Sequence, residues 1–207
     1  MSDYKNPQLI IETSKTKEGT VTWRSPSNIA IIKYWGKYGV QLPKNPSFSL
    51  TLNAAFTETT VAYAPKTGVD RGIELDFSFE GQPNAAFKNK IQQFLESILD
   101  IFPFLKQLKL TIHSKNSFPH SAGIASSASS MSALALCLCT IEDEIFGTLR
   151  EDFEFRRKAS FVARLGSGSA CRSIYEIGAI WGESGEVTGS SNEFAVPYMD
   201  NIHSVFT

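Results

Sequence analysis

Residues 118–139 read FPHSAGIASSASSMSALALCLC, and this stretch decides how the rest of the chain is arranged. Pro119 and Gly123 interrupt regular structure, small residues and hydroxyls follow, and an apolar run begins at Met131. One helix face is formed by Met131, Leu134, Ala135, Leu138, Ile141 and Ile145, and most of another by Leu136 and Cys137. Because the helix is apolar nearly all round, we predict that it is central and buried.

The start of this helix has the features of an anion site. Backbone N–H groups at a helix N-terminus have no partner within the helix, and the helix dipole adds partial positive charge there. Gly123 lets the backbone approach an anion closely, and Ser126 and Ser127 supply hydroxyl donors. The alternative is a serine N-cap followed by small residues that pack under a sheet. The stretch alone leaves both interpretations open.

The hydrophobic pattern on either side predicts a mixed fold. In chain order it indicates strands over 20–35, 47–65 and 72–81, a helix over 87–102 ended by Pro103, a strand over 108–114, a helix over about 150–165 capped by Gly166, and a Gly/Ser loop that leads into a short apolar strand. Strands come in runs and do not alternate strictly with helices, which favours an α+β fold.

Composition narrows the function classes. Twenty basic residues stand against 21 acidic ones, so no overall field attracts nucleic acid or an anionic membrane. The three cysteines have no CxxC spacing and the three histidines have no metal-ligand spacing. We find neither a signal peptide nor about 18 consecutive apolar residues, and we expect a cytoplasmic protein.

A cationic stretch, SPSNIAIIKYWGKYG, covers residues 25–39. Lys33 and Lys37 flank Tyr34 and Trp35, and they lie on one side of the strand if the strand stays regular. Lysines in an apolar strand either reach solvent or meet an anion. A solvated strand end is therefore the alternative to an anion site.

A second stretch, RLGSGSACRS, covers residues 164–173 and suits anion binding too. Its serines alternate with glycines, and Arg172 follows in a position suited to a bidentate carboxylate or phosphate contact. The alternative is a helix-ending loop with a surface arginine. Cys171 is expected to be a packed small residue, because no histidine lies nearby in sequence. The chain lacks GxxxxGK[ST], GxGxxG and GxSxG motifs, so it does not match a P-loop, a dinucleotide-binding or a serine-hydrolase pattern.

Four motifs together resemble those of the diphosphomevalonate decarboxylases, which belong to the wider family of galactose, homoserine, mevalonate and phosphomevalonate (GHMP) kinases. The motifs are NIAIIKYWGK (28–37), LPKNPSFSLTL (42–52), FPHSAGIASSASS (118–130) and GSGSACRSIY (166–175). They follow the family's order and spacing, and the resemblance covers most of residues 20–183.

The resemblance implies an α+β, GHMP-kinase-type two-layer fold with a left-handed βαβ unit in its N-terminal lobe. It implies an ATP-binding domain over residues 20–190 and a truncated linker or second lobe over 191–207. Residues 1–19 are polar, and we expect a loose arm there. Members have a second lobe that supplies an aspartate and a further arginine, and we match neither before Thr207. We therefore expect a fragment that lacks the C-terminal lobe; a protein of this length alone is expected to be inactive or unstable.

The implied activity is ATP-dependent decarboxylation of mevalonate 5-diphosphate to isopentenyl diphosphate, through phosphorylation of the 3-hydroxyl. ATP and Mg²⁺ are the implied cofactors, a homodimer is the implied assembly, and no nucleic-acid or membrane partner is expected. The alternatives are a mevalonate 3-kinase and a non-catalytic nucleotide-binding domain.

The resemblance also assigns site residues. For the ATP phosphates it implies Pro119, Ser121, Ala122, Gly123, Ile124, Ala125, Ser126 and Ser127. For the substrate diphosphate it implies Tyr34, Lys37, Ser167, Gly168 and Ser169. Arg172 is implied to bind the substrate carboxylate, and Lys33 to act near the reacting phosphate. Metal ligands are not identified.

The motifs depart from the family pattern in three places. Residues 120–123 read HSAG where TAAG is common, Ser129 and Ser130 stand where Ala-Gly is common, and Pro46 replaces a common serine. These differences concern nucleotide contacts and not the fold.

Overall fold

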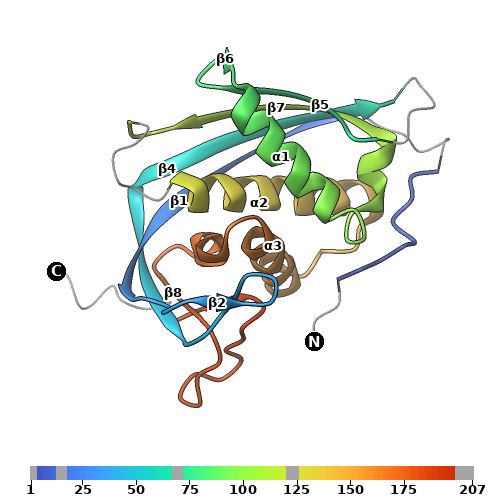
Figure 1. The fold of residues 1–207 in the computed structure, drawn as a ribbon. Helices are drawn as coiled ribbons and strands as arrows, with labels where there is room; N and C mark the ends of the chain where they lie inside the picture. The colour runs from blue at the N-terminus through green and yellow to red at the C-terminus, as the bar shows by residue number, and fades with distance from the viewer. Residues whose placement is uncertain (1–3, 13–17, 67–71, 120–125, 199–207) are drawn as a thin grey trace.

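Two long antiparallel strands, β1 (Gly19–Ile32) and β4 (Ser47–Pro65), form the frame of the fold. In the computed structural model, which describes residues 4–12, 18–66, 72–119 and 126–198, both strands bend through the whole height of the molecule (Figure 1). The helices lie inside this bend, next to the concave side of the sheet. The predicted α+β class is confirmed.

The other elements are shorter. The strands are β2 (Lys37–Tyr38), β3 (Leu42–Pro43), β5 (Glu74–Phe79), β6 (Gln82–Pro83), β7 (Leu108–Asn116), β8 (Gly178–Trp181) and β9 (Ala195–Pro197). The α-helices are α1 (Ala85–Ser97), α2 (Ser126–Phe146) and α3 (Asp152–Gly166), and the 3₁₀ helices are η2 (Pro103–Gln107) and η3 (Gly168–Ile174).

Strand β4 changes neighbours along its length. One of its edges pairs with β1 over residues 48–52 and 56–63, with an irregularity between them, while the other pairs with β8 over residues 47–50 and with β7 over residues 57–65. Strands β5 and β7 are parallel neighbours joined through α1, which makes a βαβ unit. The sheet order is β6-β5-β7-β4-β8-β9, and β1 pairs with β4 outside this order. The same strand thus supports two different regions of the molecule.

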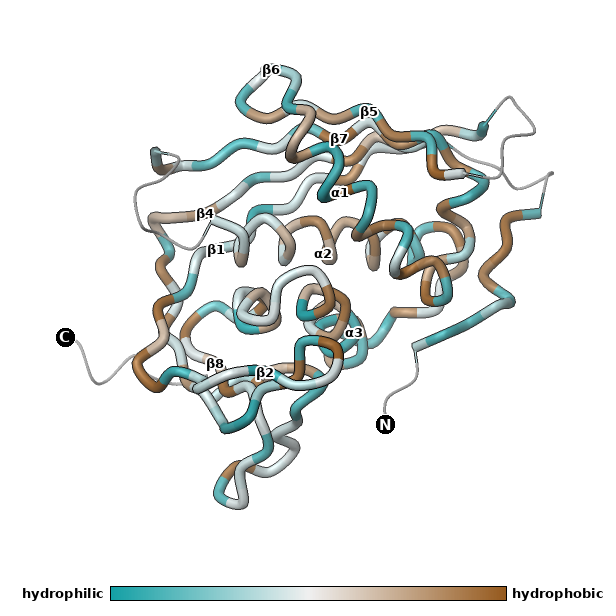
Figure 2. Tube along the Cα trace, viewed as in Figure 1, coloured by the Kyte–Doolittle hydropathy of each residue, from teal (hydrophilic) through white to brown (hydrophobic). Residues whose placement is uncertain are grey.

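Helix α2 is central and buried, as its all-round apolar pattern predicts. Figure 2 shows its hydrophobic middle between the sheet and α3. Cys137, Leu138 and Ile141 have no exposed surface, and even Glu142, near its end, is 2 % exposed. No helix among the described residues is long and apolar enough to cross a membrane.

Helix α1 ends earlier than predicted, at Ser97 instead of residue 102. Ile98 leaves helical geometry (φ −111°, ψ 14°), and its carbonyl accepts bonds from the N–H groups of Ile101 and Phe102 in a turn. Pro103 disfavours helical backbone at Phe102. Ile98 and Phe102 still enter the core, so the apolar pattern identified their burial correctly and the helix end incorrectly.

The described part of the N-terminal arm is not loose, contrary to prediction. Leu9 and Ile11 are buried, at 2 % and 5 % exposed. The backbone of Ile11 exchanges two hydrogen bonds with the Gln107 side chain, at 2.8 and 2.9 Å. At the other end, strand β9 pairs with β8, so the folded unit continues past residue 190, where we expected it to end.

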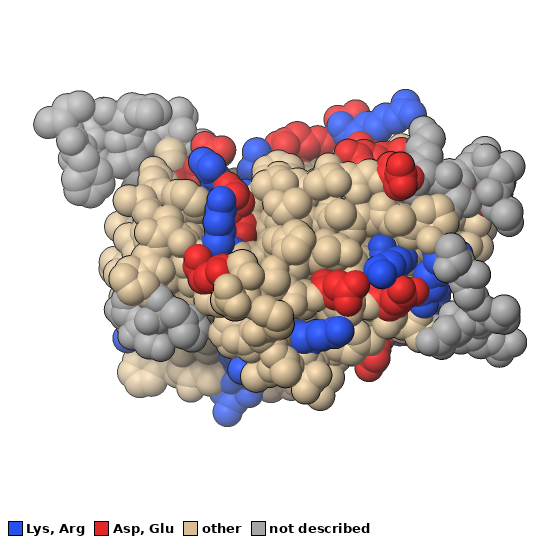
Figure 3. Space-filling view, turned by 90° about the horizontal axis from the view of Figure 1, so that it is seen from above, with Lys and Arg blue, Asp and Glu red and all other residues tan. Residues whose placement is uncertain are grey.

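Charged side chains on the outer sheet face alternate in sign. Glu58 pairs with Lys115 at 2.7 Å and with Arg24 at 2.6 Å, and these contacts hold its carboxyl pKa below the usual value. Figure 3 shows acidic and basic groups interspersed on the face it views. This face therefore offers no single-sign surface of the kind that nucleic acid requires.

The buried ion pair between helices α2 and α3 generates a stability prediction. Lys158 Nζ lies 2.5 Å from Glu142 Oε2, and the two side chains are 4 % and 2 % exposed. Lys158→Met leaves Glu142 buried without its cation and should lower the free energy of unfolding by about 3–5 kcal/mol in urea denaturation. The matched control, Lys88→Met, removes a surface pair and should change it by about 0.5 kcal/mol or less. If Lys158→Met and Lys88→Met lower the free energy of unfolding equally, Glu142 does not depend on Lys158 as a buried partner.

Candidate functional site

The candidate site centres on Arg172, which η3 carries into the concave side of the sheet. The side chain is 2 % exposed. Its Nε donates to Ser49 Oγ at 3.0 Å, its Nη1 to Ser47 Oγ at 2.6 Å and its Nη2 to Asn28 Oδ1 at 3.3 Å. None of these acceptors is charged, and no carboxylate among the described residues pairs with the guanidinium. Arg172 is therefore a buried cation in a neutral cradle.

Arg172 has two N–H donors that the cradle does not use. A guanidinium has five N–H donors, and the cradle uses three of them. One N–H therefore remains on each of Nη1 and Nη2, and a carboxylate can accept from two guanidinium nitrogens at once. Burial lowers the pKa of the guanidinium relative to its ordinary value. An anion that enters this site regains the electrostatic stabilisation that the cation loses on leaving water.

The cradle depends on an unexpected orientation of β4. Its apolar residues alternate with serines, as the sequence shows, but the serines occupy the buried face: Ser47 and Ser49 are each 1 % exposed. Phe48 lies half-buried on the other face, against the ring of Tyr198. The PSFS sequence was the available signal, because its alternation of polar and apolar residues marks a strand with two different faces. The alternation is compatible with either face being buried.

Lys37 is the second cation of the site. Its Nζ lies 5.5 Å from the centre of the Tyr34 ring and 2.5 Å from Gln41 Oε1. A Cβ added to Gly168 would lie 3.1 Å from this Nζ, so the glycine lets β2 and η3 approach closely. Tyr34 also lies under the Arg172 guanidinium, 5.9 Å from its Cζ. The structure thus brings together Tyr34, Lys37, Gly168 and Arg172.

The expected strand through Lys33 and Lys37 does not exist. Strand β1 ends at Ile32, and Gly36 has φ +148°, a conformation that an L-residue rarely adopts. Asn45 fixes the break, because its Oδ1 accepts from the Trp35 N–H and its Nδ2 donates to the Lys33 carbonyl. The Lys33 side chain is exposed and forms no hydrogen bond or ion pair with any described residue. Lys33 is not brought into the Arg172 cluster.

The expected Gly/Ser loop is the 3₁₀ helix η3. Gly166 is the last residue of α3 and not its cap, which is Ser167. A side chain at 166 would meet Met131 Sδ at 2.7 Å, so close packing accounts for this glycine. The Ser169 carbonyl accepts from Asn28 Nδ2 at 3.1 Å, and Ser167 is half-buried at the start of η3.

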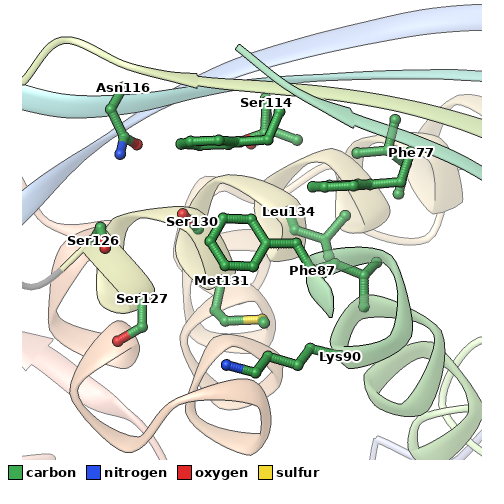
Figure 4. Close-up of a pocket in the computed structure, with 14 residues that line it drawn as sticks. Phe77, Phe87, Lys90, Ser114, Asn116, Ser126, Ser127, Ser130, Met131 and Leu134 are labelled. Carbon is green, nitrogen blue, oxygen red and sulfur yellow. The ribbon is translucent and has the colours of Figure 1, made fainter. Parts of the chain in front are cut away.

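A cavity of about 300 Å³ opens beside the first turns of α2. Figure 4 shows Ser126 and Ser127 at one end and aromatic side chains above and beside it, with the Lys90 amine directed toward Ser127. The lining residues are Thr59, Phe77, Phe79, Phe87, Lys90, Ile91, Ile112, Ser114, Asn116, Ser126, Ser127, Ser130, Met131 and Leu134. An apolar slot that ends at the N-terminus of a 21-residue helix suits a planar ring carrying an anionic group.

The other residues expected to bind phosphate are mostly not described. Pro119 is exposed, just before the gap in the described chain. Ser121, Ala122, Gly123, Ile124 and Ala125 lie outside the described residues. Sequence reasoning missed Asn28, Ser47 and Ser49, although all three lie within quoted motifs, and it missed the cavity wall from β5 and α1, because no motif marks those residues.

The three cysteines are free and fully buried, which supports packing and not nucleophilic chemistry. Burial raises the pKa of the Cys137 and Cys171 thiols to about 12 and raises that of Cys139 as well. The described residues contain no group of three or more histidine, cysteine, aspartate or glutamate side chains that could hold a metal ion.

Three comparisons place the chain among known proteins. The family model for the diphosphomevalonate decarboxylase-like N-terminal domain matches residues 25–193. The diphosphomevalonate decarboxylase of Eremothecium gossypii is 34% identical over 193 residues, which is 86% of this chain and 45% of that protein. The chain therefore spans about half the length of the curated relatives it matches.

Solved structures agree. Mevalonate diphosphate decarboxylase from Staphylococcus aureus has a TM-score of 0.70 and 32% identity, with 90% of this chain and 52% of that chain covered. A structure described as MDDEF in complex with MVAPP, AMPPCP and magnesium has a TM-score of 0.66 and 34% identity, with 86% and 50% covered.

The buried thiols generate a prediction of reactivity. At about pH 8, thiols with a pKa of about 12 should react with a thiolate-directed reagent about a thousandfold more slowly than an ordinary cysteine. We expect almost no labelling in the folded protein and complete labelling of all three cysteines in guanidinium, measured by intact mass. Rapid native labelling of Cys171 alone is the contrary result, since it requires an accessible thiolate beside Arg172.

Proposed function

The chain belongs to the diphosphomevalonate decarboxylase family, and we propose that it forms the nucleotide and substrate site of an ATP-dependent decarboxylase. The proposed substrate is mevalonate 5-diphosphate and the proposed product is isopentenyl diphosphate. Phosphorylation of the tertiary 3-hydroxyl creates a leaving group, and loss of phosphate and CO₂ completes the reaction.

The observation that carries this proposal is the neutral cradle of Arg172. A buried guanidinium with two free N–H groups on adjacent nitrogens matches a carboxylate better than it matches any group within the described chain. Decarboxylation requires the carboxylate to be held in a fixed direction relative to the carbon that loses the phosphate. We assign this orienting role to Arg172.

The substrate diphosphate is assigned to the neighbouring groups. Lys37 supplies a cation beside Tyr34, and its position next to Gly168 supports a diphosphate that spans β2 and η3. We assign Ser167 and Ser169 as hydroxyl donors on the same diphosphate. Lys33 is exposed, and its proposed role near the reacting phosphate rests on the family resemblance alone.

The nucleotide is assigned to the cavity beside α2. Its aromatic lining suits a purine, and Ser126 and Ser127 lie where the helix N-terminus favours phosphate. Lys90 is a further cation at this end of the cavity. Mg²⁺, when bound, neutralises phosphate charge. The described residues offer no carboxylate cluster, so serine hydroxyls and the phosphates themselves are the ligands we propose.

Strand β1 brings the two halves of the site together. Asn28 holds Arg172, and the preceding residue, Ser27, bonds to Ser129 of α2. A phosphate at the α2 N-terminus and a carboxylate at Arg172 can therefore belong to reactants that meet over this strand. The homodimer implied by the resemblance and the cytoplasmic location expected from the sequence stay predictions.

Arg172→Met tests the assigned carboxylate contact. We expect the affinity for mevalonate 5-diphosphate to fall about a hundredfold in calorimetric titration, because a buried, hydrogen-bonded charge pair is lost. ATP affinity should change by less than about threefold, since Arg172 lies outside the cavity. Arg172→Lys should recover little of this affinity, because it keeps the positive charge and loses the bidentate geometry of the guanidinium. Arg156→Met is the control and should bind as the wild type does, because Arg156 belongs to α3 and contacts only the last residue of η3, Ile174. Equal loss of both ligands by Arg172→Met contradicts the role.

The reaction itself is tested with the full-length product of the gene that encodes this sequence. Incubated with ATP, Mg²⁺ and mevalonate 5-diphosphate, it should release ADP and CO₂ in equal amounts. ADP without CO₂, with mevalonate as the better substrate, indicates a mevalonate 3-kinase instead. Binding of both ligands with release of neither product indicates a non-catalytic domain.

A further inference from the structure

Asn116 is one of three polar side chains, with Thr59 and Ser114, that the sheet contributes to the lining of the cavity next to α2. It is the last residue of β7 and lies directly opposite Thr57 of β4 in the strand register. Figure 4 shows its carboxamide directed from the sheet toward Ser126 and Ser130. Its Oδ1 accepts a hydrogen bond from Thr57 Oγ1 at 2.8 Å. The orientation of this amide therefore depends on Thr57.

Thr57 is itself part of a buried row of hydroxyls. Its Oγ1 lies 2.6 Å from Ser129 Oγ, and Ser27 Oγ donates to Ser129 Oγ at 3.3 Å. Ser27, Thr57 and Ser129 have no exposed surface. Water therefore does not compete for these bonds, and each hydroxyl must find its hydrogen-bond partners within the protein.

Hydrogen counting gives the row a direction. Each hydroxyl has one hydrogen. Thr57 uses its hydrogen on Asn116 Oδ1, so it accepts from Ser129, and Ser129 accepts in turn from Ser27. The only other acceptor recorded for Ser129 is the Ser126 carbonyl, at the longer distance of 3.2 Å. With its oxygen occupied, the amide presents its NH₂ group to the cavity.

We propose that Thr57 and Ser129 are positioning residues for the nucleotide site: a one-way chain of hydroxyl hydrogen bonds from Ser27 holds the Asn116 amide with its NH₂ facing the nucleobase. The proposal rests on the proposed nucleotide function of the cavity. An amide fixed in this way donates only, so it selects a base edge that carries an acceptor, such as a purine ring nitrogen. A freely rotating amide offers a donor or an acceptor and selects less strongly.

Three variants separate positioning from simple packing. Thr57→Val keeps the shape and removes the hydroxyl, and we expect it to weaken ATP binding about tenfold. Ser129→Ala removes the preceding donor and should weaken ATP binding about threefold. Thr57→Ser restores the hydroxyl and should bind within about twofold of the wild type. Because Ser129→Ala introduces a good helix former inside α2, it provides the test even if Thr57→Val does not fold.

A second measurement does not depend on any ligand. In protein labelled with ¹⁵N-asparagine, the NH₂ signals of Asn116 are assigned by their loss in Asn116→Asp. Two separate, slowly exchanging signals are expected in the wild type and in Thr57→Ser. In Thr57→Val and in Ser129→Ala they should shift and broaden. Asn116→Asp, which cannot donate, should also weaken ATP binding at least about tenfold.

The outcomes distinguish this proposal from the one it rests on. Unchanged Asn116 signals and wild-type ATP affinity in both Thr57→Val and Ser129→Ala overturn the positioning role. A structure in which the amide NH₂ points to Thr57 overturns it as well. If the wild type binds no ATP but Thr57→Val still alters the Asn116 signals, the positioning role stands and the nucleotide assignment fails.

Discussion

A buried guanidinium surrounded by neutral oxygens is the constraint on which the candidate site depends. Arg172 leaves water almost completely, and its recorded hydrogen-bond partners are two serine hydroxyls and one amide oxygen. Such a cradle requires that Ser47 and Ser49 face inward, that β1 places Asn28 opposite them, and that η3 brings the arginine between the two strands. Each requirement opposes the simplest hydrophobic packing, in which the apolar residues of β4 would fill this space. The local geometry is therefore not explained by core packing, and it is consistent with the proposed binding of a substrate carboxylate.

The long β1–β4 pair explains how one sheet supports two subsites. Because β4 exchanges β8 for β7 along one edge, the residues before the exchange line the Arg172 cradle and those after it line the cavity beside α2. Consecutive residues of β1 face the two regions: Ser27 bonds to α2, while Asn28 bonds to Arg172 and to the backbone of η3. A change in strand pairing at this point displaces both subsites together. Their separation is set by backbone and not by flexible side chains.

The sequence predicted the parts of this arrangement that are governed by local periodicity. Helix α2 is apolar all round, and its burial follows from that pattern. The grouping of Arg172, Lys37 and Gly168 followed from the family resemblance, while the residue types alone indicated two separate candidate anion-binding stretches. What periodicity could not supply is orientation: the PSFS alternation fits either face of a strand, and the choice is made by a guanidinium 123 residues away. The break after Ile32 depends likewise on Asn45, a side chain distant from it in sequence.

Two further buried cations have partners of a different kind from those of Arg172. Lys158 is neutralised by Glu142, and Arg164 donates to the backbone carbonyls of Glu193 and Val40. The fold thus provides a carboxylate or well-aligned carbonyls where a buried cation only joins helices or loops. At Arg172 three of the N–H donors bond to neutral side-chain oxygens, which are weaker acceptors than a carboxylate. One N–H on each of Nη1 and Nη2 is left available. Keeping a desolvated cation in this state costs stability, and in the proposed function the substrate carboxylate offsets that cost. Among these three buried cations, Arg172 is the one whose hydrogen bonds go to neutral side chains, and the proposed function places a carboxylate beside it.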